Sequence, residues 1–227
     1  MDHFNWNALD RAWPYLLDGM YTTAMLTAVG MVLGVLLGTG LAIARQFGPG
    51  WLAWLARLYT DIFRSIPLIL TIFWVYFLVP YVLRAVTGNP NLDVGPVYAA
   101  LTAFVLAEAA YFGEIIRGGL SSVPKGQMQA ATALGMGQFT ALRLILLPQA
   151  FRNMMPSLVS QSVGLLMDTS LVYVISLNDF LGAATKVAQR DGTIVEVYLF
   201  VAAVYLLVCS LGAGLVALLQ RRHAARG

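Results

Sequence analysis

Long stretches without charged residues alternate along this chain with shorter segments that carry most of the charges. A helix that crosses the hydrocarbon core of a bilayer needs about 20 mostly apolar residues, so each long stretch is a candidate span. We expect five spans, at about residues 19–44, 63–84, 97–119, 153–175 and 196–220. The pattern therefore predicts an all-α integral membrane protein in which residues 1–227 form a single transmembrane domain.

Composition supports a membrane protein and disfavours an ordinary cytosolic enzyme. Of the 227 residues, 59% are hydrophobic and 11% are charged, whereas roughly a quarter of the residues in a soluble domain are charged. The formal net charge of +3 does not indicate a nucleic-acid partner, because basic residues of membrane proteins collect at cytoplasmic loop ends. We expect the chain to contact the lipid bilayer and no nucleic acid.

The basic residues are unevenly divided between the two ends of the spans. If the N-terminus is outside, the inner segments hold Arg45, Arg57, Arg64, Arg117, Lys125, Arg143, Arg152, Arg221, Arg222 and Arg226. The outer segments hold only Arg11, Arg84, Lys186 and Arg190. Cytoplasmic loops carry the excess of Lys and Arg, so the N-terminus is expected outside and the C-terminus in the cytoplasm.

Small residues repeat at every fourth position of the first span. Gly30, Gly34 and Gly38 lie on one helix face, where another helix can approach closely. The alternative is a glycine hinge that flexes during a transport cycle.

The inner connection between the third and fourth spans, about residues 121–150, has the pattern of a folded helix pair. Pro124 can open a helix and Gly135 can end it, and helical periodicity resumes over 139–147, before Pro148. Two short helices on the cytoplasmic side could dock into a groove of a soluble partner. The alternative is a simple loop.

The segment QAATALGMGQFTALRLILLP, residues 129–148, resembles the coupling loop of ABC importer permeases, where E-A-A, a glycine, an isoleucine and L-P recur. The matching residues are Ala130, Ala131, Gly135, Ile145, Leu147 and Pro148. Gln129 stands where the pattern has glutamate, so an ion pair made by that glutamate in relatives would here be a neutral hydrogen bond. The resemblance implies that this loop contacts an ATPase.

Three further segments extend the resemblance over most of the chain. FRSIPLILTIFWVYF, EAAYFGEIIRGGLSSVPKGQ and DTSLVYVISLNDF are similar to segments of polar amino-acid permeases of the histidine/glutamine type, and closest in wording to glutamate/aspartate permease subunits. Ser65, Ile66 and Met167 depart from the wording of many of these permeases. The resemblance implies a type I ABC importer permease fold and import of glutamate or aspartate, with glutamine or a basic amino acid as the alternative.

The resemblance also implies a set of partners in the bacterial inner membrane. These are two ATP-binding subunits, a second permease subunit in a heterodimer or a homodimer, and a periplasmic solute-binding protein. The sequence has no G-x-x-x-x-G-K-[ST] phosphate loop, so we expect a transporter subunit without a cofactor of its own, with ATP and Mg bound by the partner ATPase. A membrane-embedded enzyme and a passive channel are the competing interpretations.

Ionisable residues within spans are costly, by roughly 2.5–3.5 kcal/mol on insertion scales, and therefore mark candidate functional positions. Glu108 and Asp168 could each match the ammonium group of an amino acid. The other members of the candidate substrate pathway are neutral: Ser65, Tyr111, Gln161, Thr169 and Ser170. In the structural alternative, Glu108 bonds to hydroxyls of a neighbouring helix and Asp168 caps a helix together with Thr169 and Ser170.

Two other charged sites have structural interpretations. Glu114 and Arg117 are three residues apart, a spacing at which they can pair, and we expect a local ion pair near the cytoplasmic end. Arg64 is expected to anchor the second span at the cytoplasmic interface. No cluster of His, Cys and acidic residues has metal-ligand spacing, so no metal site is predicted. The outer stretch of residues 178–196 is a candidate contact for the binding protein.

Overall fold

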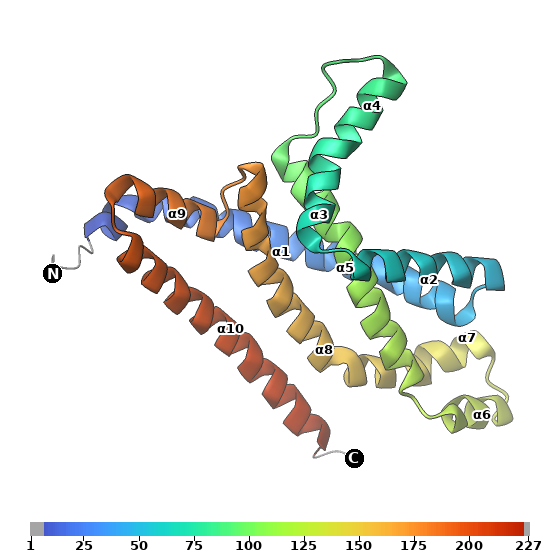
Figure 1. The fold of residues 1–227 in the computed structure, drawn as a ribbon. Helices are drawn as coiled ribbons and strands as arrows, with labels where there is room; N and C mark the ends of the chain where they lie inside the picture. Colours follow the sequence, from blue (N-terminus) through green and yellow to red (C-terminus); the bar gives the residue numbers. More distant parts are fainter. Residues whose placement is uncertain (1–6, 225–227) are drawn as a thin grey trace.

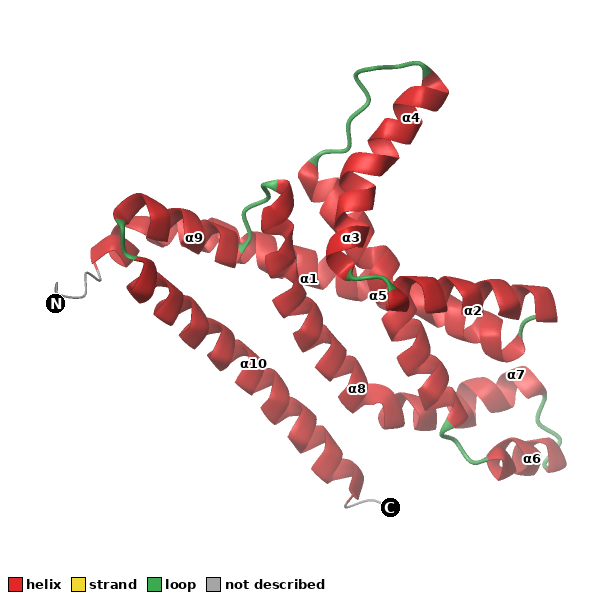
Figure 2. Cartoon of the chain, in the orientation of Figure 1, coloured by secondary structure: helices red, strands yellow, loops and turns green. Residues whose placement is uncertain are grey.

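The computed structural model describes residues 7–224, which form helices joined by short connections and contain no strand (Figures 1 and 2). Five helical stretches of this part are long and apolar enough to cross a membrane. They are Arg11–Phe47, Leu68–Thr87, Pro96–Ser121, Gln138–Ile175 and Ile194–Leu218. The expectation of an all-helical chain with five spans is confirmed. Arg226, one of the predicted inner basic residues, lies outside the described residues.

The first and third spans form the centre of the subunit. Helices α1 (Asn7–Phe47) and α5 (Pro96–Ser121) make the most extensive contact between any two described elements. A Cβ atom added at Gly38 would lie 2.6 Å from the backbone nitrogen of Gly113, and one at Gly34 would lie 2.9 Å from Cβ of Glu108. The glycine face of α1 is therefore a close packing surface, as such small-residue patterns in spans generally are.

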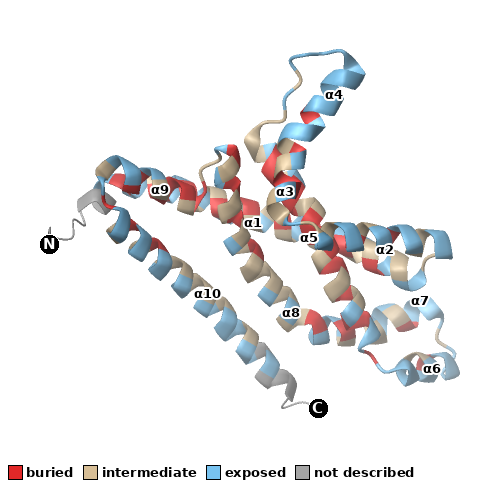
Figure 3. Ribbon diagram, viewed as in Figure 1, coloured by how far each residue is buried: buried red, intermediate tan, exposed pale blue. Residues whose placement is uncertain are grey.

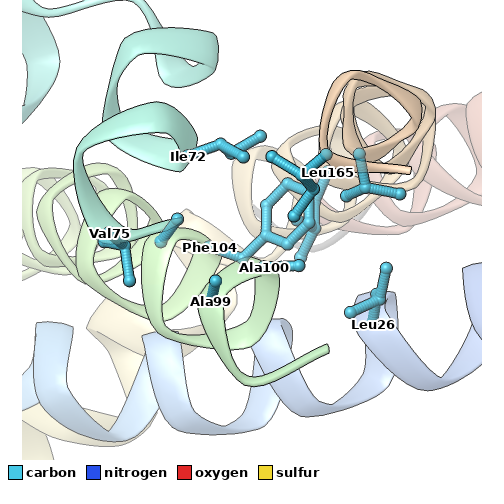
Figure 4. Packing of buried hydrophobic residues seen from close by; sticks show 10 residues of the cluster. Leu26, Ile72, Val75, Ala99, Ala100, Phe104 and Leu165 are labelled. Atoms are coloured by element: carbon cyan, nitrogen blue, oxygen red, sulfur yellow. The ribbon is translucent and has the colours of Figure 1, made fainter. Parts of the chain in front are cut away.

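A cluster of buried apolar side chains joins four spans around this pair (Figure 4). Leu26 comes from α1, Phe104 from α5, Ile72 from α3 (Leu68–Phe73) and Leu165 from α8 (Leu147–Asp168). All four side chains are fully buried. The core consequently fixes α3 and α8 against the α1–α5 pair.

The structure contains a helix that the charge-free stretches of the sequence did not predict. Helix α2 (Gly50–Ser65) is amphipathic: Arg57 and Asp61 are exposed while Ala56 and Thr60 are buried. It packs on α1 and α5, and the hydroxyl of Tyr59 donates a hydrogen bond to the carbonyl of Leu106 at 2.7 Å. Burial raises the pKa of Tyr59 to about 12.

Helix α2 ends where a proline follows. Ile66 has extended backbone angles (φ −100°, ψ 131°), as expected for a residue that precedes proline. The described helix of the second span consequently starts at Leu68, after Pro67, whereas the predicted span began at about residue 63.

Two π-helical turns, Trp74–Leu78 and Leu142–Leu146, interrupt the second and fourth spans. Each ends two residues before a proline, Pro80 or Pro148. Proline lacks an N–H and its ring clashes with the carbonyl four residues earlier, and a wide π turn lets the helix continue past this defect. Helices α4 (Val79–Thr87) and α8 follow without a break.

The second helix of the predicted cytoplasmic pair therefore does not stop before Pro148, and that part of the prediction was wrong. Helix α7 (Gln138–Ala141) runs through the π turn into α8. The first helix of the pair, α6 (Lys125–Ala133), is separate, and Gly135 follows it with a φ of +80°. A positive φ is a conformation that glycine adopts without strain.

Helices α9 (Phe180–Asp191) and α10 (Ile194–Ala224) complete the chain. Helix α9 lies alongside the N-terminal part of α1 and is largely buried, whereas most of α10 is exposed (Figure 3). Large apolar side chains on α10, including Leu206 and Leu211, are exposed on the surface of the subunit. In a chain that spans a membrane, such a surface faces lipid or a partner subunit.

Candidate functional site

Glu108 lies in the middle of α5 and is 1% exposed. Gln161, on α8, donates from Nε2 toward both carboxyl oxygens, at 3.2 and 3.1 Å. The hydrogen-bond donor to Glu108 is thus the amide of Gln161, not a hydroxyl as in the structural alternative. This contact is a polar link between α5 and α8 within apolar surroundings.

Asp168 is the last residue of α8 and is partly exposed. It lies seven residues beyond Gln161, which is about two turns along the same helix face. Its side chain makes no capping hydrogen bond, so the structural alternative in which Asp168 caps a helix was wrong. The reason is that the chain continues directly into the 3-10 helix Thr169–Ile175, and the backbone N–H of Thr169 already bonds to Leu165 and Met167.

The acid that caps a helix is Asp179, at the start of α9. Its carboxylate accepts hydrogen bonds from the backbone N–H groups of Leu181 and Gly182, at 3.2 and 2.8 Å. Burial raises the pKa of Asp179, and the two N–H donors act in the opposite direction. An N-cap acid before a short amphipathic helix is a signal that the sequence does contain.

The predicted pair of Glu114 and Arg117 is part of a larger ionic cluster. The Arg117 guanidinium bonds to one carboxyl oxygen of Glu114, and Arg45 Nη1 lies 2.5 Å from the other. Arg45 Nη1 also lies 3.5 Å from the Thr60 hydroxyl of α2. The cluster joins α1, α2 and α5 close to the point where α5 leads into the coupling loop.

Arg64 and Tyr111 form a further contact between α2 and α5. The guanidinium carbon lies 5.8 Å from the centre of the Tyr111 ring, a cation–π distance. Ser65 beside it is exposed and donates its hydroxyl to the carbonyl of Asp61 within α2, at 2.6 Å.

The structure therefore divides the predicted pathway residues among three places. Glu108 and Gln161 are in contact, and Tyr111 and Ser65 lie at or beside Arg64. The third place is the C-terminal end of α8, with Asp168, Ser170 and the buried Thr169, whose hydroxyl donates to the carbonyl of Leu166 at 2.7 Å.

The residues of the predicted coupling loop begin in the projection formed by α6 and α7 (Figure 1). Ala131 is buried, whereas Gln129 and Ala130 are exposed. Leu134 and Phe139 are 81% and 74% exposed. Ile145 lies in the second π turn and Leu147 and Pro148 begin α8, so the motif runs from the projection into the fourth span.

Comparison with known proteins identifies the family of this chain. A family model described as "Binding-protein-dependent transport system inner membrane component" matches residues 17–224. The glutamate/aspartate import permease protein GltK of Escherichia coli O157:H7 is 44% identical over 225 residues, which cover 99% of this chain and 100% of the relative. The glutamine transport system permease protein GlnP of Escherichia coli K12 is 29% identical over 220 residues, 96% and 97% of the two chains.

A solved structure supports the same assignment. The crystal structure of an amino acid ABC transporter with histidines matches with a TM-score of 0.84 and 26% identity, over 97% of this chain and 99% of that chain. The predicted type I ABC importer permease fold is confirmed by this match. A family of this kind implies an ATPase, a substrate-binding protein and a second permease as partners.

The five spans, the α6–α7 projection and the full-length similarity agree with one another, and the relatives are transporter subunits, not enzymes. The chain belongs to the family of binding-protein-dependent transport system inner membrane components, as a permease subunit of an ABC amino-acid importer.

Proposed function

We propose that this permease imports glutamate and aspartate. The observation that carries the proposal is the 44% identity to the glutamate/aspartate permease over its whole length. The alternative is another polar amino acid, either a basic one or glutamine. The 29% identity to the glutamine permease supports glutamine as that alternative.

The complete importer would contain two permease subunits, two ATP-binding subunits and a periplasmic solute-binding protein. The two permeases would be a heterodimer, with a homodimer as the alternative. The exposed Leu134 and Phe139 at the tip of the α6–α7 projection offer the apolar side chains that docking into a groove of an ATPase requires. ATP and Mg would be held by the ATPase, whose closure would bias the permeases between inward- and outward-facing arrangements.

The topology we propose places the N-terminus in the periplasm and the C-terminus and the α6–α7 projection in the cytoplasm. The excess of arginine and lysine on the inner side supports it. A test starts from the Cys209→Ser variant, which removes the single cysteine. New single cysteines are placed at Leu134 and at Lys186, which are both exposed. In intact spheroplasts, a membrane-impermeant maleimide should label the position 186 variant and leave the position 134 variant unlabelled, and the reverse result would contradict the topology.

The substrate pathway we propose follows polar side chains on α5 and on its neighbours α2 and α8. Gln161 and Asp168 share a face of α8, and Gln161 is bonded to Glu108 of α5. The carboxyl groups could receive the ammonium of an amino acid, and Ser65, Tyr111, Thr169 and Ser170 add hydroxyl groups along the route. Acidic residues inside spans commonly mark such routes.

The experiment that tests the function is uptake by the reconstituted importer in liposomes. The complex of both permeases and the ATPase is supplied with ATP, the cognate binding protein and a panel of labelled amino acids. We expect glutamate and aspartate uptake in step with ATP hydrolysis. Uptake of glutamine or arginine in preference to both would overturn the substrate assignment, and uptake that does not depend on ATP would contradict the importer mechanism.

A further inference from the structure

The candidate pathway contains two acids and no base. Glu108 and Asp168 can match the ammonium of an amino acid, and the other members are neutral (Ser65, Tyr111, Gln161, Thr169 and Ser170). Every α-amino acid also carries a carboxylate, which requires hydrogen-bond donors when it leaves water. The pathway as predicted from sequence offers this carboxylate hydroxyl and amide donors but no positive charge.

Arg64 lies where such a partner is needed. Its guanidinium stacks over the Tyr111 ring, 5.8 Å from the centroid, and Tyr111 is one turn of α5 away from Glu108. Tyr111 is ten residues before the last residue of α5, which corresponds to about 15 Å along the helix at 1.5 Å per residue. The Arg64 guanidinium therefore lies beside the stretch of α5 between Glu108 and the ionic cluster at Glu114.

Arg64 also has donors to spare. Among the described residues no carboxylate lies within ion-pair distance of it. The acid that acts on this region electrostatically is Glu114, but its two oxygens are occupied by Arg45 and Arg117. Arg64 is exposed, so its planar set of five N–H donors is open to a carboxylate from outside the chain. The region has three arginines to one glutamate and attracts anions.

We propose that Arg64 binds the α-carboxylate of the transported amino acid and so fixes the orientation of the substrate, an inference that rests on the proposed amino-acid import. The α-carboxylate and the ammonium are attached to the same carbon atom, and Tyr111, over whose ring Arg64 lies, is about one helical turn from Glu108 along α5. The head group of the substrate spans this interval with opposite charges at its two ends. The side-chain carboxylate of glutamate lies further away and contacts other residues.

The test is a double-mutant cycle between Arg64 and the ligand. Equilibrium binding of L-glutamate, L-isoglutamine and L-glutamine is measured by calorimetry on the purified permease–ATPase complex without binding protein. Isoglutamine lacks the charge of the α-carboxylate and glutamine lacks that of the side chain. The wild type should bind isoglutamine about tenfold or more weakly than glutamate, the usual range for a lost hydrogen bond to a charged group.

In Arg64→Gln, glutamate affinity should fall by about the same factor, and the ratio between glutamate and isoglutamine should shrink toward one. The ratio between glutamate and glutamine should stay as in the wild type. The matched control is Arg57→Gln, on the same helix, where Arg57 is exposed and faces Asp61 at 3.6 Å; it should leave all three affinities unchanged. Thermal unfolding and basal ATP hydrolysis show whether each variant complex is intact.

Two results would overturn the role of Arg64. If the affinity loss from Arg64→Gln and the affinity loss from α-amidation of the ligand multiply when both changes are combined, Arg64 and the α-carboxylate do not interact. A collapse of the glutamate-to-glutamine ratio instead would assign Arg64 to the side-chain carboxylate. The proposed function fails separately, because it is judged by uptake of the wild-type importer; if the panel identifies another amino acid, the cycle is run with that amino acid and its α-amide.

Discussion

The α1–α5 pair and the α6–α7 projection are built in opposite ways. In the α1–α5 pair the backbones approach so closely at Gly38 and Gly113 that no Cβ fits between them. In the projection, the glycines at 135 and 137 have open space around them, and apolar side chains such as Leu134 and Phe139 are exposed. The comparison separates residues that hold the subunit together from residues that are available to a partner.

The difference predicts which kind of measurement responds to a mutation in each region. Changes in the α1–α5 pair should alter the free energy of unfolding of the permease itself. Changes in the projection should alter the communication with the ATPase while the fold stays intact.

The largest effect on stability is expected for Gly38→Ala. The new Cβ would meet the Gly113 nitrogen at 2.6 Å and the Ala109 carbonyl oxygen at 2.9 Å. Both are backbone atoms, so the helices must separate, and we expect a loss of about 2–3 kcal/mol of unfolding free energy. Thermal unfolding in detergent measures it. The control is Gly40→Ala on the same helix, which has nothing within 4 Å of the new methyl group; equal stability of the two variants would contradict the close approach.

The next effect concerns the ionic cluster that borders both regions. Glu114→Gln leaves the Arg45 and Arg117 guanidinium groups, whose side chains are 17% and 32% exposed, without their carboxylate. We expect a loss of about 1–3 kcal/mol. Asp61→Asn removes the partner of Arg57 from a pair that is 70% and 61% exposed and should cost less than about 1 kcal/mol. If denaturation curves of the two variants coincide, the cluster is no stronger than a surface ion pair.

A smaller and different effect is expected for Gly135→Ala. Alanine at a φ of +80° is strained by about 1 kcal/mol, which should reorient the end of α6 while thermal unfolding of the permease changes little. The number of amino acids imported per ATP hydrolysed by the reconstituted complex should fall. Gly137→Ala is the control, since Gly137 has a φ of −64° that alanine adopts easily. Unchanged coupling in Gly135→Ala would argue against a role of this turn in docking.

The smallest effect concerns the N-terminal half of α1, where Asp179 caps α9 beside Gly19. Burial raises the pKa of Asp179, so its contribution to stability is fully present below the ordinary aspartate pKa and is lost as the pH rises through the raised value. Asp179→Asn keeps an oxygen acceptor for the cap and should be more stable than wild type by about 0.5 kcal/mol at pH 7, with no advantage near pH 4. Asp179→Ala, which removes the cap, should be less stable at both values. An asparagine variant that is destabilised equally at pH 4 and pH 7 would contradict the sign of the shift.

Spans and local pairs could be predicted from the sequence because they depend on neighbouring residues. A charge-free stretch marks a span by itself, and Glu114 and Arg117 are three residues apart on one helix. Helix α2 was not predicted, because it is amphipathic and carries Arg57 and Asp61 on its exposed side, so it contains no long charge-free stretch. The helix past Pro148 was missed because the π turn that accommodates proline has no simple sequence signal.

Contacts between helices could not be predicted in the same way. Arg45 is 69 residues away from Glu114, and Gln161 is 53 residues away from Glu108. Which residues meet depends on where two helices cross, and at the α1–α5 crossing this is decided by the position of Gly38 against Gly113. The sequence therefore marked Glu108 and Glu114 as acids within a span but did not show that Gln161 and Arg45 contact them.

The length of α1 has a mechanical consequence. Its 41 residues make a rod of about 60 Å, roughly twice the thickness of the hydrocarbon core. One end packs on α9 through Ala12 and Leu16, and the other carries Arg45 into the ionic cluster. Because α1 is packed against α5 along its glycine face, from Gly30 to Gly38, a single rigid element connects the ionic cluster at one end with α9 at the other.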